Sequence, residues 1–231
     1  MNATHPVALV TGASRGLGRA LATHLAERGT HVVLVARQQV PLDAAVAAIR
    51  AAGGQAWGIA VDLGDPEAAA RITGQASALA GPVSLVIHNA STLGPTPLRP
   101  LADTTPDELE RVLQVNLLGP FRLTRLLVGQ MALHGGGTVV SISSDAAVEA
   151  YPTWGAYSVS KAALDHLVRV WAEELPSVRF LAVDPTEMDT ALHAAALPDA
   201  DPSTLARPDD VARRLLDHLD GPLTSGSRLV A

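Results

Sequence analysis

Hydrophobic and polar positions change along this chain in blocks that predict strands and helices in turn. Short, nearly unbroken apolar runs predict buried strands at residues 7–10, 31–36, 56–61, 85–88, 138–143, 178–183 and 228–230. Apolar residues at helical spacing predict helices at residues 17–28, 43–52, 67–79, 106–133, 155–175 and 209–219. Strands that are apolar on both faces are typical of a parallel sheet covered by helices. The pattern therefore predicts an α/β fold with a doubly wound parallel sheet of about seven strands, flanked by helices on both faces.

No internal repeat and no linker divides the 231 residues, so we expect a single domain over residues 1–231. In a doubly wound sheet, ligands bind at the carboxyl ends of the strands. The stretch 186–206, rich in Ala, Pro and Asp, is the least periodic part of the chain. We interpret it as a loop or lid on the substrate side, with a plain surface loop as the alternative.

Composition narrows the classes of function. The chain is 48% hydrophobic and 17% charged, which is typical of a folded domain, and no apolar run approaches the ~20 residues that span a bilayer. The net charge of −6 argues against nonspecific nucleic-acid binding. Cysteine is absent and residues 1–6 lack a secretory pattern, so we expect a cytoplasmic protein without disulfides. High Ala, Arg and Pro favour a bacterial source, and no metal-ligand cluster is evident.

A glycine-rich turn follows the first predicted strand and opens the first helix. It reads Thr-Gly-Ala-Ser-Arg-Gly-Leu-Gly over residues 11–18. Glycines at such a turn let the backbone approach a pyrophosphate, which then lies at the helix N-terminus. The spacing Gly-x-x-x-Gly-x-Gly differs from the commoner dinucleotide pattern. We therefore predict a nucleotide-binding turn.

The end of the second predicted strand bears on which dinucleotide binds. NAD-binding proteins often place an acidic residue here for the ribose 2′-hydroxyl, but this chain has Ala36 followed by Arg37. Arg37 and Arg15 can clamp a 2′-phosphate through charge-assisted hydrogen bonds, which predicts NADP(H) as the cofactor. Solvated loop arginines are the alternative. Asp62 is either a partner of the adenine amine or the cap of the next helix.

The only lysine of the chain, Lys161, follows Tyr157 by four residues on a predicted helix. Positions i and i+4 share a helix face, so the ammonium can lie beside the phenol. A nearby cation lowers the pKa of a tyrosine from about 10, which predicts a general acid and base usable near neutral pH. An accidental surface pair is the alternative.

Further motifs give the chain a resemblance to a known family over essentially its whole length. They are His-Asn-Ala-Ser at 88–91, Val-Asn-Leu at 115–117, Ile-Ser-Ser at 142–144, Tyr-Ser-Val-Ser-Lys at 157–161 and Asp-Pro-Thr-Glu-Met-Asp-Thr at 184–190. With the glycine turn, their order and separation resemble those of the short-chain dehydrogenases/reductases. The resemblance implies a Rossmann fold and an oxidoreductase that acts on carbonyl or alcohol groups.

The resemblance implies a catalytic tetrad of Asn116, Ser144, Tyr157 and Lys161. Tyr157 would give a proton to the substrate carbonyl oxygen as hydride arrives, and Ser144 would hydrogen-bond the same oxygen. Lys161 would lower the tyrosine pKa and hold the nicotinamide ribose. Asn116 would kink the long helix and position a water in the proton path.

The resemblance also implies cofactor contacts along the strand ends. The predicted cofactor-binding residues are Gly12, Ser14, Arg15, Gly16, Leu17, Gly18, Arg37, Asp62, Asn89, Ala90, Tyr157, Lys161, Pro185, Thr186, Met188 and Thr190. Two positions depart from the family, which usually has glycine where Ser91 and Thr186 stand. Each departure adds a Cβ close to the cofactor, so we expect activity with altered substrate preference.

The predicted substrate pocket contains Ser91, Asp145, Tyr151, Trp154 and Glu187. Tyr151 and Trp154 either form an aromatic wall for the substrate or pack the core. The region is similar to sepiapterin-reductase-like and benzil-reductase-like members, which implies a small aromatic or vicinal dicarbonyl substrate reduced with NADPH. A 3-oxoacyl thioester reductase and an NADP-binding regulatory or signalling protein are the alternatives. The resemblance further implies a homodimer or homotetramer.

Overall fold

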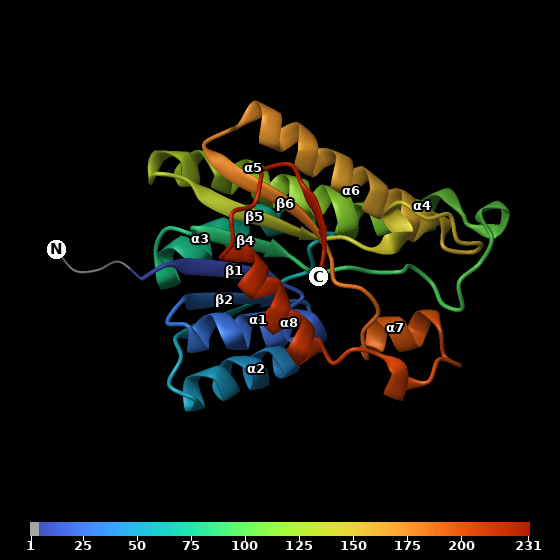
Figure 1. Ribbon diagram of the computed structural model, residues 1–231, viewed down its shortest axis with the longest axis horizontal. Coiled ribbons are helices and arrows are strands. Elements are labelled where there is room, and N and C mark those ends of the chain that lie inside the picture. The colour runs from blue at the N-terminus through green and yellow to red at the C-terminus, as the bar shows by residue number, and fades with distance from the viewer. Residues whose placement is uncertain (1–4) are drawn as a thin grey trace.

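The computed structural model describes residues 5–231, which form one seven-stranded parallel sheet with helices on both faces (Figure 1). The strands are β1 (Val7–Thr11), β2 (His31–Ala36), β3 (Ala56–Ala60), β4 (Leu85–His88), β5 (Gly137–Ile142), β6 (Val178–Asp184) and β7 (Arg228–Val230). The helices are α1 (Gly16–Glu27), α2 (Gln39–Ala51), α3 (Ala68–Ala80), α4 (Pro106–Leu113), α5 (Gly119–Leu133), α6 (Gly155–Glu174), α7 (Ala191–Ala196) and α8 (Pro208–Leu219). The predicted α/β class and sheet are confirmed.

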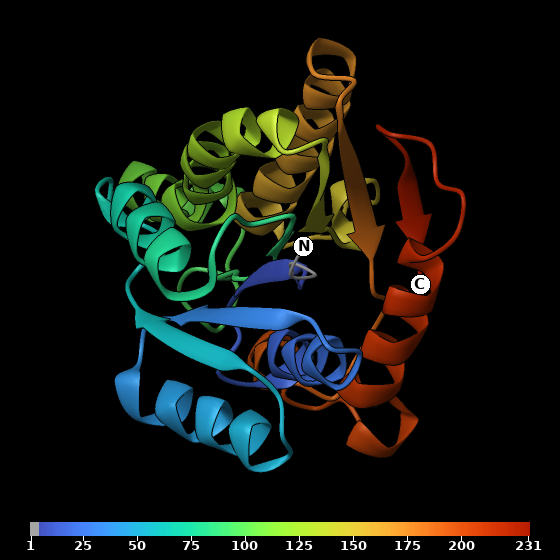
Figure 2. The ribbon, with the colours of Figure 1, turned by 90° about the vertical axis from the view of Figure 1, so that its left-hand side faces the viewer.

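The strands lie in the order β3-β2-β1-β4-β5-β6-β7, so the chain reverses its direction of travel across the sheet between β1 and β4. Ala8 and Val10 of β1 pack beneath α1, α2 and α8, whereas Val7 and Leu9 pack beneath α3, α5 and α6. Figure 2 shows these two helical layers on opposite sides of the sheet. Burial on both faces explains why the strands are apolar at successive positions.

The predicted helix over residues 106–133 is wrong in one respect. α4 and α5 are separated by a π-helical segment at Gln114–Leu118, which contains the buried Asn116. Such π segments insert one residue into the helical repeat and are frequent at functional sites. Asn116, the residue expected to kink the long helix, lies within this π segment.

Other differences lie at helix ends and in short helices. α2 begins at Gln39, before the predicted residue 43, because Pro41 falls in the first turn, where no intrahelical N–H bond is needed. α7 has six residues and lies within the stretch expected to be loop or lid. A helix of six residues is too short to produce a recognisable periodic pattern in the sequence.

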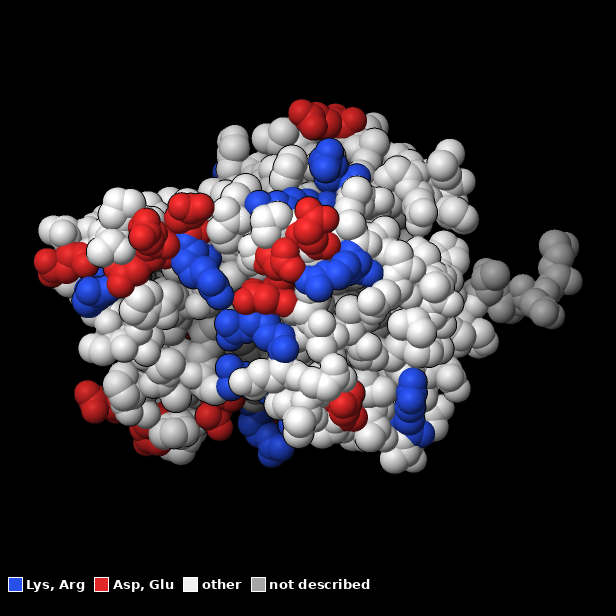
Figure 3. Space-filling view, turned by 180° about the vertical axis from the view of Figure 1, so that it is seen from behind, with Lys and Arg blue, Asp and Glu red and all other residues white. Residues whose placement is uncertain are grey.

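Two surface features bear on function. Among the described residues, no helix combines the length and hydrophobicity needed to cross a membrane. On the face shown in Figure 3, basic and acidic side chains are interspersed, and no continuous basic surface forms there.

Candidate active site

A cavity of about 1220 Å³ opens at the carboxyl ends of the central strands. Its walls come from the segments that follow β1, β2, β3, β4, β5 and β6, and from α6 and α7. In Figure 1, α7 lies beyond the strand ends on this side of the molecule. The reversal of strand order between β1 and β4 is the place where doubly wound sheets bind ligands.

Nearly all the predicted site residues line this one cavity. They are Gly12, Ser14, Arg15, Gly16, Leu17, Arg37, Asp62, Asn89, Ala90, Ser91, Ser144, Asp145, Tyr151, Trp154, Tyr157, Lys161, Pro185, Thr186, Glu187, Met188 and Thr190. Gly18 and Asn116 are buried and do not contribute to the lining. Residues far apart in the sequence are thus brought to one place by the parallel strands.

The glycine turn forms a cradle that side chains would fill. Gly12 and Gly16 have φ angles of 67° and 54°, which favour glycine. A Cβ at Gly12 would collide with the Ala90 backbone, and one at Gly18 would collide with the Asn89 side chain. Asn89 Nδ2 donates hydrogen bonds to the carbonyl oxygens of Thr11 (3.0 Å) and Gly12 (3.2 Å), which ties the turn to the end of β4. The cradle at the α1 N-terminus fits a pyrophosphate.

Arginine side chains stand near this cradle. Arg15 and Arg37 are exposed, line the cavity and form no salt bridge within the described part of the chain. Asp62 lines the cavity but accepts hydrogen bonds from the Gly64 N–H (2.9 Å) and from Arg111 (3.2 Å). α3 begins at Ala68, so Asp62 does not cap that helix. The donor set fits a dinucleotide that carries an extra phosphate.

Tyr157 and Lys161 are both buried on α6, at the inner end of the cavity. Lys161 Nζ donates a 2.7 Å hydrogen bond to the Ile142 carbonyl and lies 5.5 Å from the centre of the Tyr157 ring. Burial raises the pKa of Tyr157 to about 12 and lowers the pKa of Lys161 to about 8. The expected fall in the tyrosine pKa is therefore wrong, because desolvation of the phenol outweighs the hydrogen bonds from Ser144 and Ser91 that lower the pKa. At neutral pH the phenol is protonated and can act as an acid.

Ser144 lies beside the Tyr157 phenol, and its hydroxyl acts to lower the pKa of that tyrosine. Ser144 Oγ donates a 2.8 Å hydrogen bond to Asp145 Oδ1. Burial acts to raise the pKa of Asp145, but hydrogen bonds from Ser144 and Tyr151 help to hold that pKa below its usual value. An ionised carboxylate only accepts, so the serine proton points to Asp145. The neighbouring Ser143 is buried and directs its hydroxyl to the Ser144 carbonyl (3.5 Å).

Asn116 joins the π segment to the chain after β4 and to α6. Its Oδ1 accepts from the Thr92 N–H (2.8 Å), while its Nδ2 donates to the Thr92 carbonyl and to Ser160 Oγ (2.9 Å each). Ser160 in turn donates to the Tyr157 carbonyl (2.7 Å). All polar atoms of the Asn116 side chain are used, so the residue fixes the backbone behind Tyr157.

Arg228, on the last strand, was not predicted as a site residue. Its guanidinium donates to Asp165 (3.0 Å), to Asp184 (2.9 Å) and to the Ser144 carbonyl (2.9 Å). Asp165 and Asp184 are buried and also act to raise the pKa of Lys161. The cations Arg228 and Lys161 therefore balance the carboxylates Asp165 and Asp184 at the base of the site. The partners lie 44 to 84 positions from Arg228, so no local sequence signal could reveal this network.

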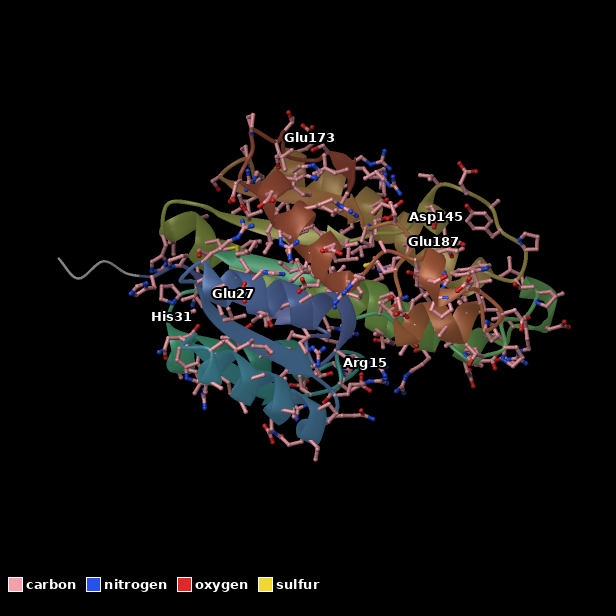
Figure 4. The ribbon with its side chains drawn as sticks, turned by 60° about the horizontal axis from the view of Figure 1, so that its bottom comes forward. Arg15, Glu27, His31, Asp145, Glu173 and Glu187 are labelled. Atoms are coloured by element: carbon pink, nitrogen blue, oxygen red, sulfur yellow. The ribbon has the colours of Figure 1, made fainter. Side chains whose placement is uncertain are left out.

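The substrate end of the cavity has an aromatic row and an acidic rim. The rings of Tyr151 and Trp154 are 6.4 Å apart, and those of Trp154 and Tyr157 are 5.7 Å apart, both edge to face. Tyr151 is 43% exposed, so it is a wall residue rather than a core residue. Its hydroxyl donates to Asp145 Oδ2 (2.9 Å). In Figure 4, Asp145 and Glu187 lie on the same side of the molecule, apart from Arg15 at the phosphate end.

Thr186, which stands where the family usually has glycine, adopts a left-handed backbone with φ of 61°. Its N–H donates a 3.0 Å hydrogen bond to Asp184 Oδ1, which holds the turn after β6. A β-branched residue in this conformation costs about 1–2 kcal/mol. The usual glycine is therefore explained by the backbone of the turn.

We expect Thr186→Gly to raise the free energy of unfolding by up to about 1 kcal/mol, because relief of strain exceeds the entropy that glycine adds to the unfolded chain. Urea denaturation measures this change. Thr153→Gly is the matched control, since Thr153 also has a positive φ, of 71°, but does not line the cavity. A loss of stability in Thr186→Gly alone would mean that the threonine side chain makes a stabilising contact that outweighs the strain.

Several further residues line the cavity without having been predicted. They include Arg19, Gln38, Leu63, Val115, His193 and Arg207. Arg19 lies one helical turn after Arg15, so the helical repeat was a usable signal for it. Arg207 follows the irregular stretch and carries no such signal. Within the described residues, no group of three or more histidine, aspartate or glutamate side chains is placed to hold a metal ion.

Comparison with known proteins agrees with this geometry. The short chain dehydrogenase family matches residues 6–201. An uncharacterized oxidoreductase of Mycobacterium tuberculosis is 38% identical over 196 residues, covering 84% of this chain and 73% of its own. Versicolorin reductase 1 of Aspergillus parasiticus is 35% identical over 213 residues, covering 89% and 80%.

Solved structures give the same result. A short chain dehydrogenase from Shigella flexneri complexed with NADP has a TM-score of 0.91 at 28% identity, over 97% of this chain and 96% of that one. One from Escherichia coli complexed with NADPH has a TM-score of 0.89 at 29% identity, over 97% and 95%. The chain belongs to the short-chain dehydrogenase/reductase family of oxidoreductases, which confirms the predicted resemblance.

Proposed function

We propose that this protein is an NADPH-dependent carbonyl reductase that reduces a small ketone, with Tyr157 as the general acid. One observation carries the proposal: a buried, protonated phenol lies beside the Ser144 hydroxyl, at the inner end of a cavity that also contains a phosphate cradle. A reduced nicotinamide bound in this cavity would supply the hydride. The carbonyl oxygen then gains negative charge and takes the phenolic proton.

Each tetrad residue has a separate task in this scheme. Lys161 is buried and cationic below pH about 8, so it stabilises the tyrosinate that forms when Tyr157 gives up its proton. Ser144 orients the reacting oxygen at the phenol by turning its hydroxyl from Asp145 to that oxygen. Asn116 holds the backbone of the Tyr157 turn through Ser160.

NADP(H) is the proposed cofactor, held by the predicted residues around the cradle. Arg15 and Arg37 are free of carboxylate partners within the described chain, and the neighbouring Ala36 offers no acidic group to a ribose 2′-hydroxyl. A guanidinium pair recognises a 2′-phosphate through charge and bidentate geometry. The two similar solved structures that contain NADP or NADPH add support.

Arg37→Ala should raise KM for NADPH about tenfold to a hundredfold and KM for NADH less than threefold, because only NADPH carries the 2′-phosphate. Steady-state kinetics with each cofactor measures the ratio. Arg125→Ala is the matched control, since Arg125 is exposed on α5 and does not line the cavity. Equal losses with both cofactors would contradict the proposed role.

The substrate class follows from the wall beside Tyr157. Tyr151 and Trp154 favour a small aromatic or vicinal dicarbonyl ketone, as in benzil-reductase-like and sepiapterin-reductase-like members. The test is NADPH consumption with aromatic vicinal diketones, pterin-like ketones, 3-oxoacyl thioesters and simple aldehydes. Preferential turnover of diketones or pterin-like ketones supports the proposal. Preference for thioesters would support a 3-oxoacyl thioester reductase, and cofactor binding without any turnover would favour a regulatory or signalling protein.

Two proposals concern the rest of the molecule. Residues 186–206 form a substrate-side lid, because Thr186, Met188 and Leu192 line the cavity from this segment.

α5 and α6 form the interface of a homodimer or homotetramer, because both carry exposed apolar residues, such as Leu126 and Val170. Light scattering measures the oligomeric state.

A further inference from the structure

Ser91 has a hydroxyl that the scheme above does not use. Its Oγ is buried, yet it has no hydrogen-bond partner among the described residues. A buried hydroxyl without a partner forfeits free energy, and such groups call for an explanation. The residue lines the cavity, so a ligand can reach it.

The position of Ser91 relates it to the reacting centre. It follows β4, which lies next to β5 in the sheet, and Ser144 follows β5. Both hydroxyls lie close enough to the Tyr157 phenol to act on its pKa in the same direction, downward. The phenol therefore has one serine from each of two neighbouring strands beside it.

The two serines differ in what their protons do. The Ser144 proton is donated to the Asp145 carboxylate, at 2.8 Å between the oxygens. The Ser91 hydroxyl donates to no carboxylate among the described residues, and the neighbour on which it acts is the Tyr157 phenol. Ser91 is thus the serine at the phenol whose donor is available to a ligand without breaking a bond to a carboxylate.

We propose that Ser91 determines specificity by donating a hydrogen bond to a second oxygen of the substrate, on the carbon next to the reacting carbonyl. Tyr157 serves the oxygen that receives the proton, and Ser91 serves its neighbour. The site then selects 1,2-diketones and α-hydroxy ketones over isolated ketones. This inference rests on the proposed carbonyl reductase function.

Discrimination between the two kinds of ketone depends on whether the Ser91 hydroxyl finds an acceptor on the bound substrate. A ketone without the second oxygen would bury the Ser91 hydroxyl against carbon, so this donor would gain no hydrogen bond from the substrate. This chain has serine where the family usually has glycine, and the serine supplies the hydroxyl that discriminates between the two kinds of ketone. The family glycine would offer no donor.

The test compares 1-phenyl-1,2-propanedione with propiophenone, which lacks the second oxygen. We expect Ser91→Ala to lower the ratio of their kcat/KM values, diketone over monoketone, about tenfold. Ser158→Ala is the matched control, because Ser158 also has a buried hydroxyl without a partner in the described chain but does not line the cavity. The control should keep the wild-type ratio.

Calorimetry with the enzyme–NADP⁺ complex gives a second readout, which needs no hydride transfer. Ser91→Ala should weaken binding of the diketone about tenfold more than binding of the monoketone. A ratio unchanged in both assays overturns the role of Ser91 while the reductase function stands. Equal losses for both ketones also overturn it, because Ser91 would then act on the reacting oxygen. A wild-type protein that neither reduces nor binds either ketone overturns the proposed function, and this inference with it.

Discussion

Tyr157→Phe should lower kcat/KM for ketone reduction about a thousandfold, because it removes the one phenolic proton at the reacting oxygen. The phenylalanine ring keeps the packing against Trp154, whose ring lies 5.7 Å away, and leaves the bond between Lys161 and the Ile142 carbonyl intact. NADPH affinity should therefore change less than threefold. Single-turnover reduction and cofactor titration measure the two quantities separately.

Tyr151→Phe is the matched control, since the chain contains only these two tyrosines. Tyr151 donates to Asp145 and is 43% exposed, so its hydroxyl affects the rim rather than the proton transfer. We expect its loss of activity to be smaller than tenfold. Similar losses in the two variants, or activity in Tyr157→Phe above a tenth of the wild type, would remove Tyr157 from the role of general acid.

Arg228→Leu should lower the free energy of unfolding by about 2–3 kcal/mol. It leaves Asp165 and Asp184, which are 8% and 5% exposed, with Lys161 as the remaining cation of the network. Removing one partner of a buried ion pair costs about 3–5 kcal/mol, and solvent at the 26%-exposed Arg228 side chain reduces this figure. Denaturation by urea at pH 7 measures the change.

A second measurement separates charge from packing. Arg228→Lys should recover part of the stability but not all, since an ammonium cannot match the fork that bonds three groups. A loss below about 0.5 kcal/mol at pH 7 would show that the network contributes little. kcat should fall too, as Ser144 loses the donor to its carbonyl.

The sheet and the cavity lining follow from the sequence because their signals are local. Apolar runs define the strands, and the short motifs lie where strands end, so a parallel sheet brings them together at one edge. Asn89 and Ser144 are examples: each follows its strand within two residues. That these residues lie close together can be predicted without knowledge of side-chain packing.

Other features depend on contacts that the sequence does not display. Spacing predicts that Lys161 lies near Tyr157, but the sign of the tyrosine pKa shift depends on how completely the phenol is buried. The apolar repeat continues through the π segment at Gln114–Leu118, so it gives no sign of the interruption. Arg228 contacts its partners because β7 pairs with β6 in the sheet, and the local sequence does not indicate that pairing. The direction of the Ser144 proton depends on the rotamer of Asp145.

The solitary lysine makes the catalytic helix unusually easy to observe by proteolysis. An endoprotease that cleaves after lysine has one internal target in this chain, the bond after Lys161, and that side chain is 2% exposed in the middle of α6. Cleavage requires α6 to open, so its rate reports the population of molecules in which the catalytic helix has opened. A ligand that binds only the closed state slows the cut in proportion to its occupancy. Gel bands for one pair of fragments would therefore measure cofactor binding and local unfolding together, without a dye or an introduced label.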